Sequence, residues 1–347
     1  MLKKQTLKQV LLLVMGTLPS SAALAASGSF EPLPDGIIAA GDISGIATHN
    51  NFLLIGADEA DGANLNAVQV LSGVADGKLK LEAGRQIDLF VGVETDDGGV
   101  EMDIEGIAVE GDTVVVVGSH SAKRPRLKKK KYDKNRKRLQ AAAIKAEPNR
   151  GRIYRLQLDD NGKVKSLAHI SLSTLLAKHP VLGPYVPLPS KENGIDIEGV
   201  ALAEGKLYLG FRGPVLRDGY VPVMVLDFDG PEQNELVFVR LEGRGIRDIT
   251  RVSDGFLVIA GPVGDGTASY QLYHWDGGDM VPGKKRGGHD LGVVTPLSEI
   301  DPPVGGKAEG VTVISESDDG YHLLIAYDGV VDRGEVLQHL NVSKDGN

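Results

Sequence analysis

Short apolar runs, separated by polar turns that contain glycine, follow one another along most of the chain. The clearest unit lies within residues 197–241, and its turns carry the pairs Glu204-Gly205, Asp218-Gly219 and Asp229-Gly230. Short runs rich in valine, isoleucine and leucine that end at such turns are typical of antiparallel strands. We therefore predict four strands in this unit, at residues 197–202, 207–211, 221–228 and 235–241.

The first run of this unit belongs to a phrase that recurs along the chain. Its best copies are Asp103-Ile-Glu-Gly-Ile-Ala and Asp196-Ile-Glu-Gly-Val-Ala. Further copies occupy residues 42–47, 245–250 and 307–312, and a second apolar run follows each copy. Repeats of this kind in a strand-rich chain indicate the blades of a β-propeller. The fold class that we predict is therefore all-β, with a single β-propeller.

The number of copies predicts five four-stranded blades. A sixth blade is the alternative if residues 281–297 hold a degenerate copy. The fifth unit lacks an outer strand, and we expect residues 30–38 to supply it, because such closure removes the exposed edges of an open array.

One interval between copies is much longer than the others, because it contains a basic segment at residues 122–150. Without that segment the spacing of the copies becomes regular. We therefore predict one propeller domain, residues 26–347, with residues 122–150 as a basic loop insertion. The alanine-rich stretch at residues 141–146 favours some helix within the insertion.

The composition supports many short strands and excludes some chemistry. The chain has 347 residues with 45 glycines, and aromatic residues make up 5% of it. Because it has no cysteine, disulfides, thiolate metal sites and a cysteine nucleophile are excluded.

The N-terminus has the pattern of an export signal. Lys3, Lys4 and Lys8 precede an apolar stretch at residues 10–15, and Ala23-Leu-Ala25 has the form of a cleavage site. The apolar stretch is too short to span a membrane, which takes about 20 residues. We therefore expect residues 1–25 to be a cleaved signal peptide and the mature protein to be periplasmic or secreted, with no transmembrane segment.

The charge is distributed unevenly. The chain has a net charge of -9, yet residues 123–138 carry eleven lysines and arginines against one acid, Asp133. We call this basic stretch the arm. It is dense enough to bind an anionic small molecule or an anionic polymer of the cell envelope. The alternative is a lid that neutralises the protein's own acids. For an exported protein we expect no nucleic-acid partner, and we expect a monomer.

The recurring phrases also predict a site. In a propeller, the start of each inner strand and the end of the next strand meet at one mouth of the central channel. Five carboxylates of the phrases are candidate metal ligands there: Asp103, Glu105, Asp196, Glu198 and Glu309. Ca²⁺ takes six to eight oxygen ligands, so it is the cofactor that such a ring would hold. The candidate ligand-binding residues at the same mouth are Arg212, Arg247, Lys307, Asp58 and Asp328.

A structural role is the alternative for this ring, since acids and cations of a crowded hub can satisfy one another. Two departures from symmetry favour a functional role: Ser44 and Arg247 replace the glutamate of the phrase. His120, in Gly118-Ser-His-Ser, is the histidine best placed for proton transfer and is the catalytic candidate. Neither a Gly-x-Ser-x-Gly nor a His-Glu-x-x-His motif occurs, so nothing supports a serine hydrolase or a zinc protease.

The two best phrases, the Gly118-Ser-His-Ser segment and the Lys/Arg insertion together resemble a family of secreted bacterial propellers catalogued as a domain of unknown function. The resemblance covers about residues 43–340 and implies the fold without an activity. More distantly, the Glu-Gly-hydrophobic phrases are similar to those of phytase-like and esterase-like propellers. That similarity implies Ca²⁺-dependent phosphoester hydrolysis. Of the residues in this chain, it implies a role only for Glu105, Glu198 and Glu309, as acids of the channel mouth.

Two functions follow from these observations. The first is an exported envelope propeller of uncharacterised function that binds an anionic ligand or a partner at the channel mouth. The alternative is a Ca²⁺-dependent hydrolase of phosphoesters or esters, of phytase-like type, in which the carboxylates hold the metal that activates water. We prefer the first because the sequence names no pair of nucleophile and base.

Overall fold

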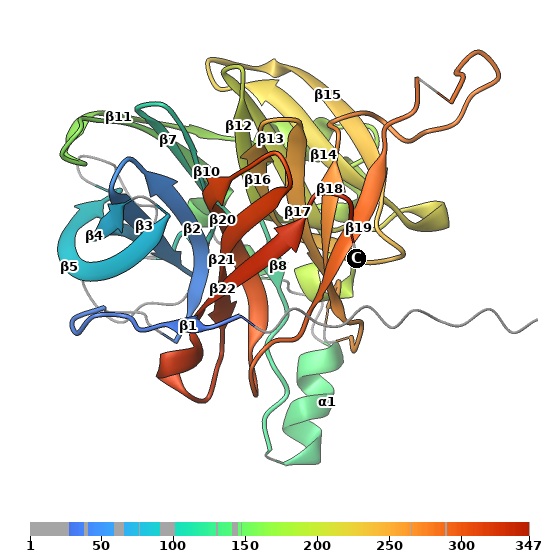
Figure 1. Ribbon diagram of the computed structural model, residues 1–347. Helices are drawn as coiled ribbons and strands as arrows, with labels where there is room; N and C mark the ends of the chain where they lie inside the picture. Colours follow the sequence, from blue (N-terminus) through green and yellow to red (C-terminus); the bar gives the residue numbers. More distant parts are fainter. Residues whose placement is uncertain are drawn as a thin grey trace, which may run out of the picture.

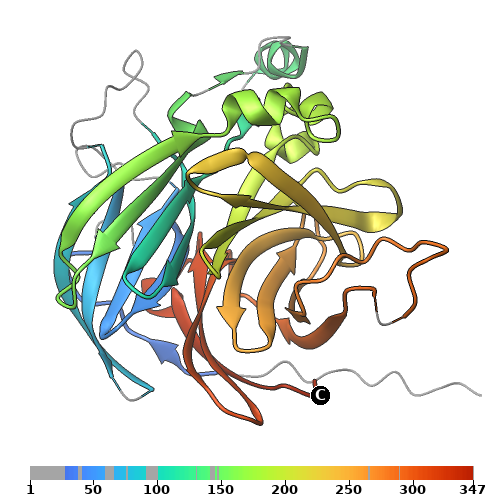
Figure 2. The same ribbon diagram turned by 90° about the horizontal axis from the view of Figure 1, so that it is seen from above.

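The computed structural model has the predicted all-β architecture, a β-propeller of five four-stranded antiparallel sheets (Figures 1 and 2). It describes residues 28–37, 41–58, 66–75, 77–90, 101–129, 131–140, 145–146, 148–264, 266–288 and 290–346. The predicted signal peptide, residues 1–25, lies outside these ranges. No helix within them is long and apolar enough to cross a membrane.

Each blade runs outward from an inner strand at the channel. The first blade consists of β2 (Ile43–His49), β3 (Phe52–Ala57), β4 (Ala67–Ala75) and β5 (Lys78–Asp88). The second consists of β6 (Ile104–Glu110), β7 (Thr113–Gly118), β10 (Arg152–Leu158) and β11 (Val164–Ser171). The third consists of β12 (Asp196–Ala203), β13 (Lys206–Gly213), β14 (Tyr220–Asp227) and β15 (Gly230–Arg240).

The last two blades settle the blade count at five. The fourth consists of β16 (Gly245–Val252), β17 (Gly255–Gly261), β18 (Tyr270–Trp275) and β19 (Val294–Ile300). The fifth consists of β20 (Lys307–Glu316), β21 (Gly320–Asp328), β22 (Leu337–Ser343) and β1 (Phe30–Glu31). Residues 281–297, the candidate for a sixth blade, thus end in β19, the outer strand of the fourth blade.

The chain closes the ring with its N-terminal strand, as predicted. In β1, Phe30 lies opposite Gln338 of β22 and Glu31 lies opposite Leu337. The core is shared between blades: Ile46 of β2, Ile259 of β17 and Ile325 of β21 belong to one buried apolar cluster. Because each blade buries its face against its neighbours, closing the ring completes the core.

The basic insertion leaves the propeller between β7 and β10. It contains the two-stranded pair β8 (Ala122–Lys123) and β9 (Lys145–Ala146) and the helix α1 (Tyr132–Gln140). The helix therefore begins earlier than the alanine-rich stretch suggested; Lys145 and Ala146 are strand, and residues 141–144 lie outside the described ranges. An acid in the first turn of α1 and two cations in its last turn complement the helix dipole.

Two further features place the insertion relative to the channel. Seen from above, α1 lies at the rim of the disc and not over its centre (Figure 2). The short helix α2 (Ser173–Lys178) follows β11 on the same side of the disc.

Candidate functional site

The inner strand of every blade contains a β-bulge at the same place. The pairing register between the inner strand and the next strand shifts at the third residue of each phrase. The bulged residues are Ser44, Glu105, Glu198, Arg247 and Glu309. A bulge leaves one residue out of the ladder and redirects its side chain, so the phrase delivers one polar side chain per blade to the channel mouth.

The glycine after the bulge allows the blades to approach closely. A Cβ added to Gly106 would lie 2.8 Å from the carbonyl oxygen of Glu198 and 3.0 Å from Val200. The repeated glycine is thus required by packing near the axis.

Two arginines connect the carboxylates of the third and fifth blades. Arg212, near the end of β13, donates to Asp196, and its Nη1 lies 2.6 Å from Oε1 of Glu198. Arg247 lies with its Nε 3.0 Å from Oε2 of Glu198 and donates to Glu309. The charges of Asp196 and Glu198 raise the pKa of Arg212, although its burial acts the other way. Both guanidinium groups are therefore fixed within the ring.

A third arginine, Arg150, closes the basic insertion and was not predicted as part of the site. It is 5% exposed. Its Nη1 donates to Asp103 and its Nη2 lies 2.9 Å from Oε2 of Glu101. Burial, only partly offset by Arg150, raises the pKa of Asp103 to about 6. The far end of the insertion thus supplies a counter-charge to the mouth.

Glu105 stands apart from these pairs. It lies half-buried in the channel, and among the described residues its carboxylate makes no hydrogen bond or ion pair. Its carboxylate comes together with those of Asp196 and Glu198, with one oxygen of each within 4.8 Å of the others. We call these three residues the Glu105 cluster.

Burial and the neighbouring acids, first among them Asp103, raise the pKa of Glu105 well above its ordinary value. Burial likewise raises the pKa of Glu198 to about 8, against the opposing charges of Arg212 and Arg247. The cluster therefore favours a positive charge, supplied by protons or by a cation.

A second group of acids lies at the same mouth. One carboxylate oxygen from each of Asp42, Asp58 and Asp328 lies within 4.8 Å of the others. Lys307 donates to Asp328 and thereby offsets part of this charge. The predicted residues Lys307, Asp58 and Asp328 are thus brought together, with Asp42 added.

Two polar residues of the phrases have structural roles. Ser44 donates to the carbonyl oxygen of Ile104 in the next blade. Asp248 accepts from the backbone N–H of Ile249 at 2.8 Å and of Val311 at 2.7 Å. Burial raises the pKa of Asp248 well above its ordinary value. These side chains join neighbouring strands and blades rather than offering groups to a ligand.

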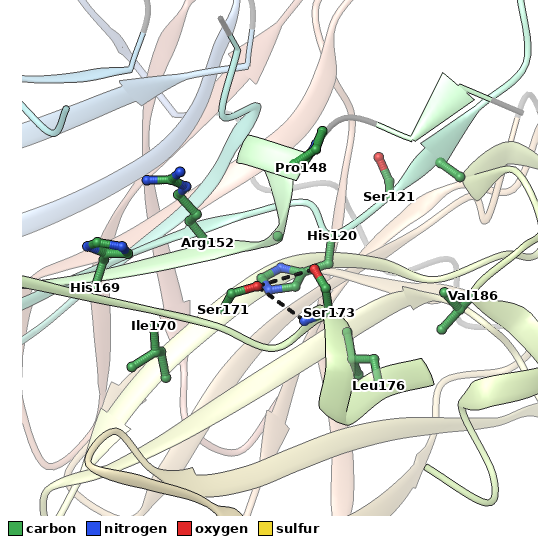
Figure 3. A pocket seen from close by; sticks show the side chains of 12 residues that line it. His120, Ser121, Pro148, Arg152, His169, Ile170, Ser171, Ser173, Leu176 and Val186 are labelled. Atoms are coloured by element: carbon green, nitrogen blue, oxygen red, sulfur yellow. Dashed lines mark hydrogen bonds between the residues drawn. The ribbon is translucent and has the colours of Figure 1, made fainter. Parts of the chain in front are cut away.

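His120 lies in a different environment from the carboxylates. Its Nδ1 donates to the carbonyl oxygen of Gly118 at 2.7 Å, and its Nε2 has no hydrogen-bond partner in the described part of the chain. Burial lowers the pKa of His120 to about 4, so the imidazole is neutral near pH 7. The ring lines a cavity beside α2, next to Ser171 and Ser173 (Figure 3), and it contacts none of the acids of the mouth.

The sequence located the five phrases, did not anticipate the bulges, and gave the pairing of the acids with the cations only as the alternative. Its five metal candidates and three cations all lie at the mouth, but Arg212, Arg247 and Lys307 are each occupied by a carboxylate. Glu309 pairs with Arg247 and stands outside the Glu105 cluster. The only sequence signal for Arg150 was its position at the end of the insertion.

Solved structures similar to the chain share little sequence identity with it. The Dos1 propeller is 13% identical, with a TM-score of 0.34 over 88% of this chain and 59% of that structure. An exo-β-1,3-galactanase from Phanerochaete chrysosporium is 10% identical, with a TM-score of 0.41 over 92% of this chain and 63% of that structure. A putative 6-phosphogluconolactonase from Bacteroides uniformis is 11% identical, with a TM-score of 0.33 over 82% and 71%. The chain thus spans less than two thirds of the first two structures.

Comparison of sequences gives a family and no characterised relative. No curated protein matches the chain. The family model described as "Protein of unknown function (DUF3616)" matches residues 42–342, which include all five copies of the phrase. The chain therefore belongs to the DUF3616 family.

Proposed function

We propose that this protein is an exported binding propeller of the cell envelope whose channel mouth binds a divalent cation, with Ca²⁺ the first candidate. The observation that carries the proposal is the Glu105 cluster. Three carboxylates approach one another there, and no described residue forms an ion pair with Glu105. A hard cation with oxygen ligands compensates such a cluster better than protons do, because it interacts with all three carboxylates at once.

In this proposal, the anionic ligand expected at the mouth binds to the cation. Arg212 and Arg247 are paired with Asp196, Glu198 and Glu309, so neither guanidinium is available as a clamp. They act as positioning residues that hold the carboxylates in place. Three carboxylates leave part of a coordination sphere of six to eight oxygens open, and a phosphate or carboxylate of a ligand can complete it.

The hydrolase alternative receives less support. Hydrolysis at a cation needs a group that takes a proton from the attacking water. The histidine that was the candidate for this role, His120, donates to Gly118 and lines a separate cavity. A binding role needs no such group.

Isothermal titration with CaCl₂ tests the proposal directly. The protein is first treated with EDTA and exchanged into metal-free buffer, and Glu105→Gln is compared with the wild type. Glu82→Gln is the matched control, because Glu82 is exposed on the outer strand β5. The proposal expects saturable binding that Glu105→Gln weakens by about tenfold or more, or about 1.4 kcal/mol, and that Glu82→Gln preserves. Equal binding by all three proteins would remove the Glu105 cluster as the site.

The exposed part of the arm gives the protein a second, polyanion-binding surface in this proposal. The cations at the base of the insertion face the mouth: Nζ of Lys123 lies 3.4 Å from Glu101, and Arg150 contacts the same carboxylate. Further along, the arm has exposed cations, namely Arg126, Lys128, Lys129, Lys131, Lys134, Arg136 and Lys137. The position of α1 at the rim (Figure 2) favours contact with an external polymer over a lid on the channel.

Export is the remaining part of the proposal, and the basic, apolar and small-residue pattern of residues 1–25 supports it. Mass spectrometry of the protein isolated from its native cell measures the mature N-terminus. The proposal expects a chain that begins at Ala26. A chain that retains Met1 or Leu2 in the cytoplasmic fraction would contradict it.

A further inference from the structure

The far end of the basic insertion exposes large apolar side chains among its cations. Leu127, Tyr132 and Leu139 are 52%, 71% and 59% exposed, and no residue of α1 is buried. We call residues 126–129 and 131–139 the tip of the insertion. A single exposed apolar residue is ordinary on a protein surface, whereas a group of them marks an interaction site. The tip therefore offers a partner both positive charge and apolar surface.

The helix α1 separates these two properties. Tyr132 and Leu139 are seven residues apart, which is close to two turns, so they lie on the same face of the helix. The exposed cations Lys134 and Lys137 fall on the opposite face by the same spacing. A helix with apolar side chains on one face and cations on the other is typical of segments that lie in a membrane interface, where tyrosine is also enriched.

Hydrogen bonds within the tip hold its apolar side chains together. Oδ1 of Asn135 accepts from the backbone N–H of Lys128 at 3.1 Å, and its Nδ2 donates to the carbonyl oxygen of Lys128 at 2.7 Å. Nη1 of Arg138 donates to the carbonyl oxygen of Arg126 at 3.1 Å. The segment that carries Leu127 is thus fixed along α1. A preformed surface loses less freedom when it binds.

The insertion projects away from the acidic body of the protein. Figures 1 and 2 show α1 beyond the sheets, at the rim of the disc. The arm carries eleven lysines and arginines against one acid, whereas the whole chain has a net charge of -9. An anionic surface repels the body and attracts the tip. Because exposed charges are screened beyond about 8 Å in physiological salt, a projecting tip can reach such a surface while the body stays away from it.

A soluble polyanion and an anionic bilayer differ in what they offer the apolar side chains. Polyphosphate offers charge alone. A phospholipid bilayer has charged groups at its surface and hydrocarbon directly beneath them. The apolar face of Tyr132 and Leu139 has a use only in the second case. The tip therefore matches a bilayer better than it matches a soluble polymer.

From this combination we infer that the tip of the insertion binds the surface of an anionic phospholipid bilayer. Leu127, Tyr132 and Leu139 insert between the lipid headgroups, and the cations of the tip bind the lipid phosphates. The inference rests on the polyanion-binding role proposed for the arm and names its partner.

Sedimentation with lipid vesicles tests the inference on the mature protein. We expect vesicles of phosphatidylglycerol to be bound at least about tenfold more tightly than vesicles of phosphatidylcholine. Combined replacement of Leu127, Tyr132 and Leu139 by glutamine should weaken binding to the anionic vesicles by about tenfold or more and leave binding to polyphosphate unchanged.

The matched control replaces Val281 and Val293 by glutamine. These side chains are 36% and 53% exposed in the loop between β18 and β19, on the other side of the disc from α1 (Figure 1), and the variant should bind vesicles like the wild type. Equal binding of anionic vesicles by the triple variant and the wild type would overturn the inference and leave the polyanion-binding role intact. Failure of the wild type to bind either vesicles or polyphosphate would contradict both.

Tryptophan fluorescence measures the insertion itself. The single tryptophan of the chain, Trp275, is fully buried, so Tyr132→Trp adds an exposed reporter. Its emission should shift to shorter wavelength with phosphatidylglycerol vesicles and not with polyphosphate, because only the bilayer takes the ring into an apolar environment. Val293→Trp should show no shift with either. Vesicle binding without a shift at Tyr132→Trp would mean contact through charge alone and would overturn the inference.

Discussion

Glu105 and Glu198 occupy the same bulge in neighbouring blades, and their carboxylates lie within 4.8 Å of each other and of Asp196. Glu198 lies between two arginines, whereas Glu105 forms no ion pair with a described residue and only feels the charge of Arg212 at longer range. The asymmetry decides how the two respond to pH and to metal. The same motif therefore gives one carboxylate that is held by two arginines and one that is in no ion pair with a described residue.

The stability of the metal-free protein should depend on the protonation of Glu105. Its pKa is raised well above 4.5 in the folded protein, so above about pH 4.5 the folded state holds more protons than the unfolded state. The free energy of unfolding should consequently fall as the pH rises from about 5 toward 8, by about 1.4 kcal/mol for each unit of pKa difference.

Urea denaturation in EDTA at several pH values measures this dependence. Glu105→Gln should show a smaller decrease between pH 5 and pH 8 than the wild type, with a residual slope from Asp103 and Glu198, whose pKa values are also raised. Identical slopes for the two proteins would mean that Glu105 is ionised in the folded state, which is incompatible with a raised pKa of its carboxyl group.

Replacement of Arg247 should strongly destabilise the folded protein. The side chain is 3% exposed and contacts both Glu198 and Glu309, so Arg247→Met leaves the buried Glu309 without its arginine and leaves Glu198 with Arg212 alone. We expect a loss of about 3–5 kcal/mol, measured by thermal or urea unfolding at pH 7. Arg217→Met is the control: Arg217 is 94% exposed, pairs with Asp218 at 3.9 Å, and should change stability by roughly 0.5 kcal/mol or less. A small effect of both substitutions would show that the ring does not depend on this arginine.

Close approach of the blades makes Gly106 intolerant of a side chain. Gly106→Ala places a Cβ 2.8 Å from the carbonyl oxygen of Glu198, and we expect a loss of about 1–3 kcal/mol as the inner strands move apart. Gly230→Ala should be tolerated, because nothing lies within 4 Å of its Cβ. Thermal unfolding of both variants checks the contrast, and equal midpoints would argue against contact between blades as the reason for the glycine.

The arm should bind polyanions without contributing to the fold. Replacing the exposed residues Lys128, Lys129, Lys131 and Lys134 by glutamine should leave the unfolding midpoint unchanged and weaken binding to polyphosphate. The affinity of the wild type should fall as salt is added, because exposed charges are screened. Binding that persists in the variant at low salt would assign the interaction to another surface.

The repeat made the fold predictable, whereas the ion pairs depend on features that the repeat does not reveal. Five copies of the phrase, four of them with glycine at the fourth place, predicted the blades, and residues 30–38 were expected to supply the closing strand. Simple alternation of strand residues does not anticipate the bulge at Glu105, because a bulge is a feature of pairing between strands. In the same way, Arg150 belongs by sequence to a cationic segment whose other members are largely solvated, and only the return of the chain to β10 buries it.

The helix in the insertion shows a similar limit. Alanine has the highest intrinsic helix propensity, so residues 141–146 were expected to contain the helix. The structure describes α1 at Tyr132–Gln140, with cations in its last turn. Of the alanine-rich stretch it describes only Lys145 and Ala146, which form β9 and pair with β8. Pairing at the base of the insertion thus outweighs intrinsic propensity at these positions.

Anomalous diffraction from crystals grown with a divalent cation tests the central claim most directly. Mn²⁺ in place of Ca²⁺ gives a strong anomalous signal and also takes oxygen ligands. We predict a peak bonded to carboxylate oxygens of Glu105, Asp196 and Glu198, and its loss in Glu105→Gln. A channel mouth without a peak at saturating Mn²⁺ and at saturating Ca²⁺ would contradict the claim that these three carboxylates form a cation site.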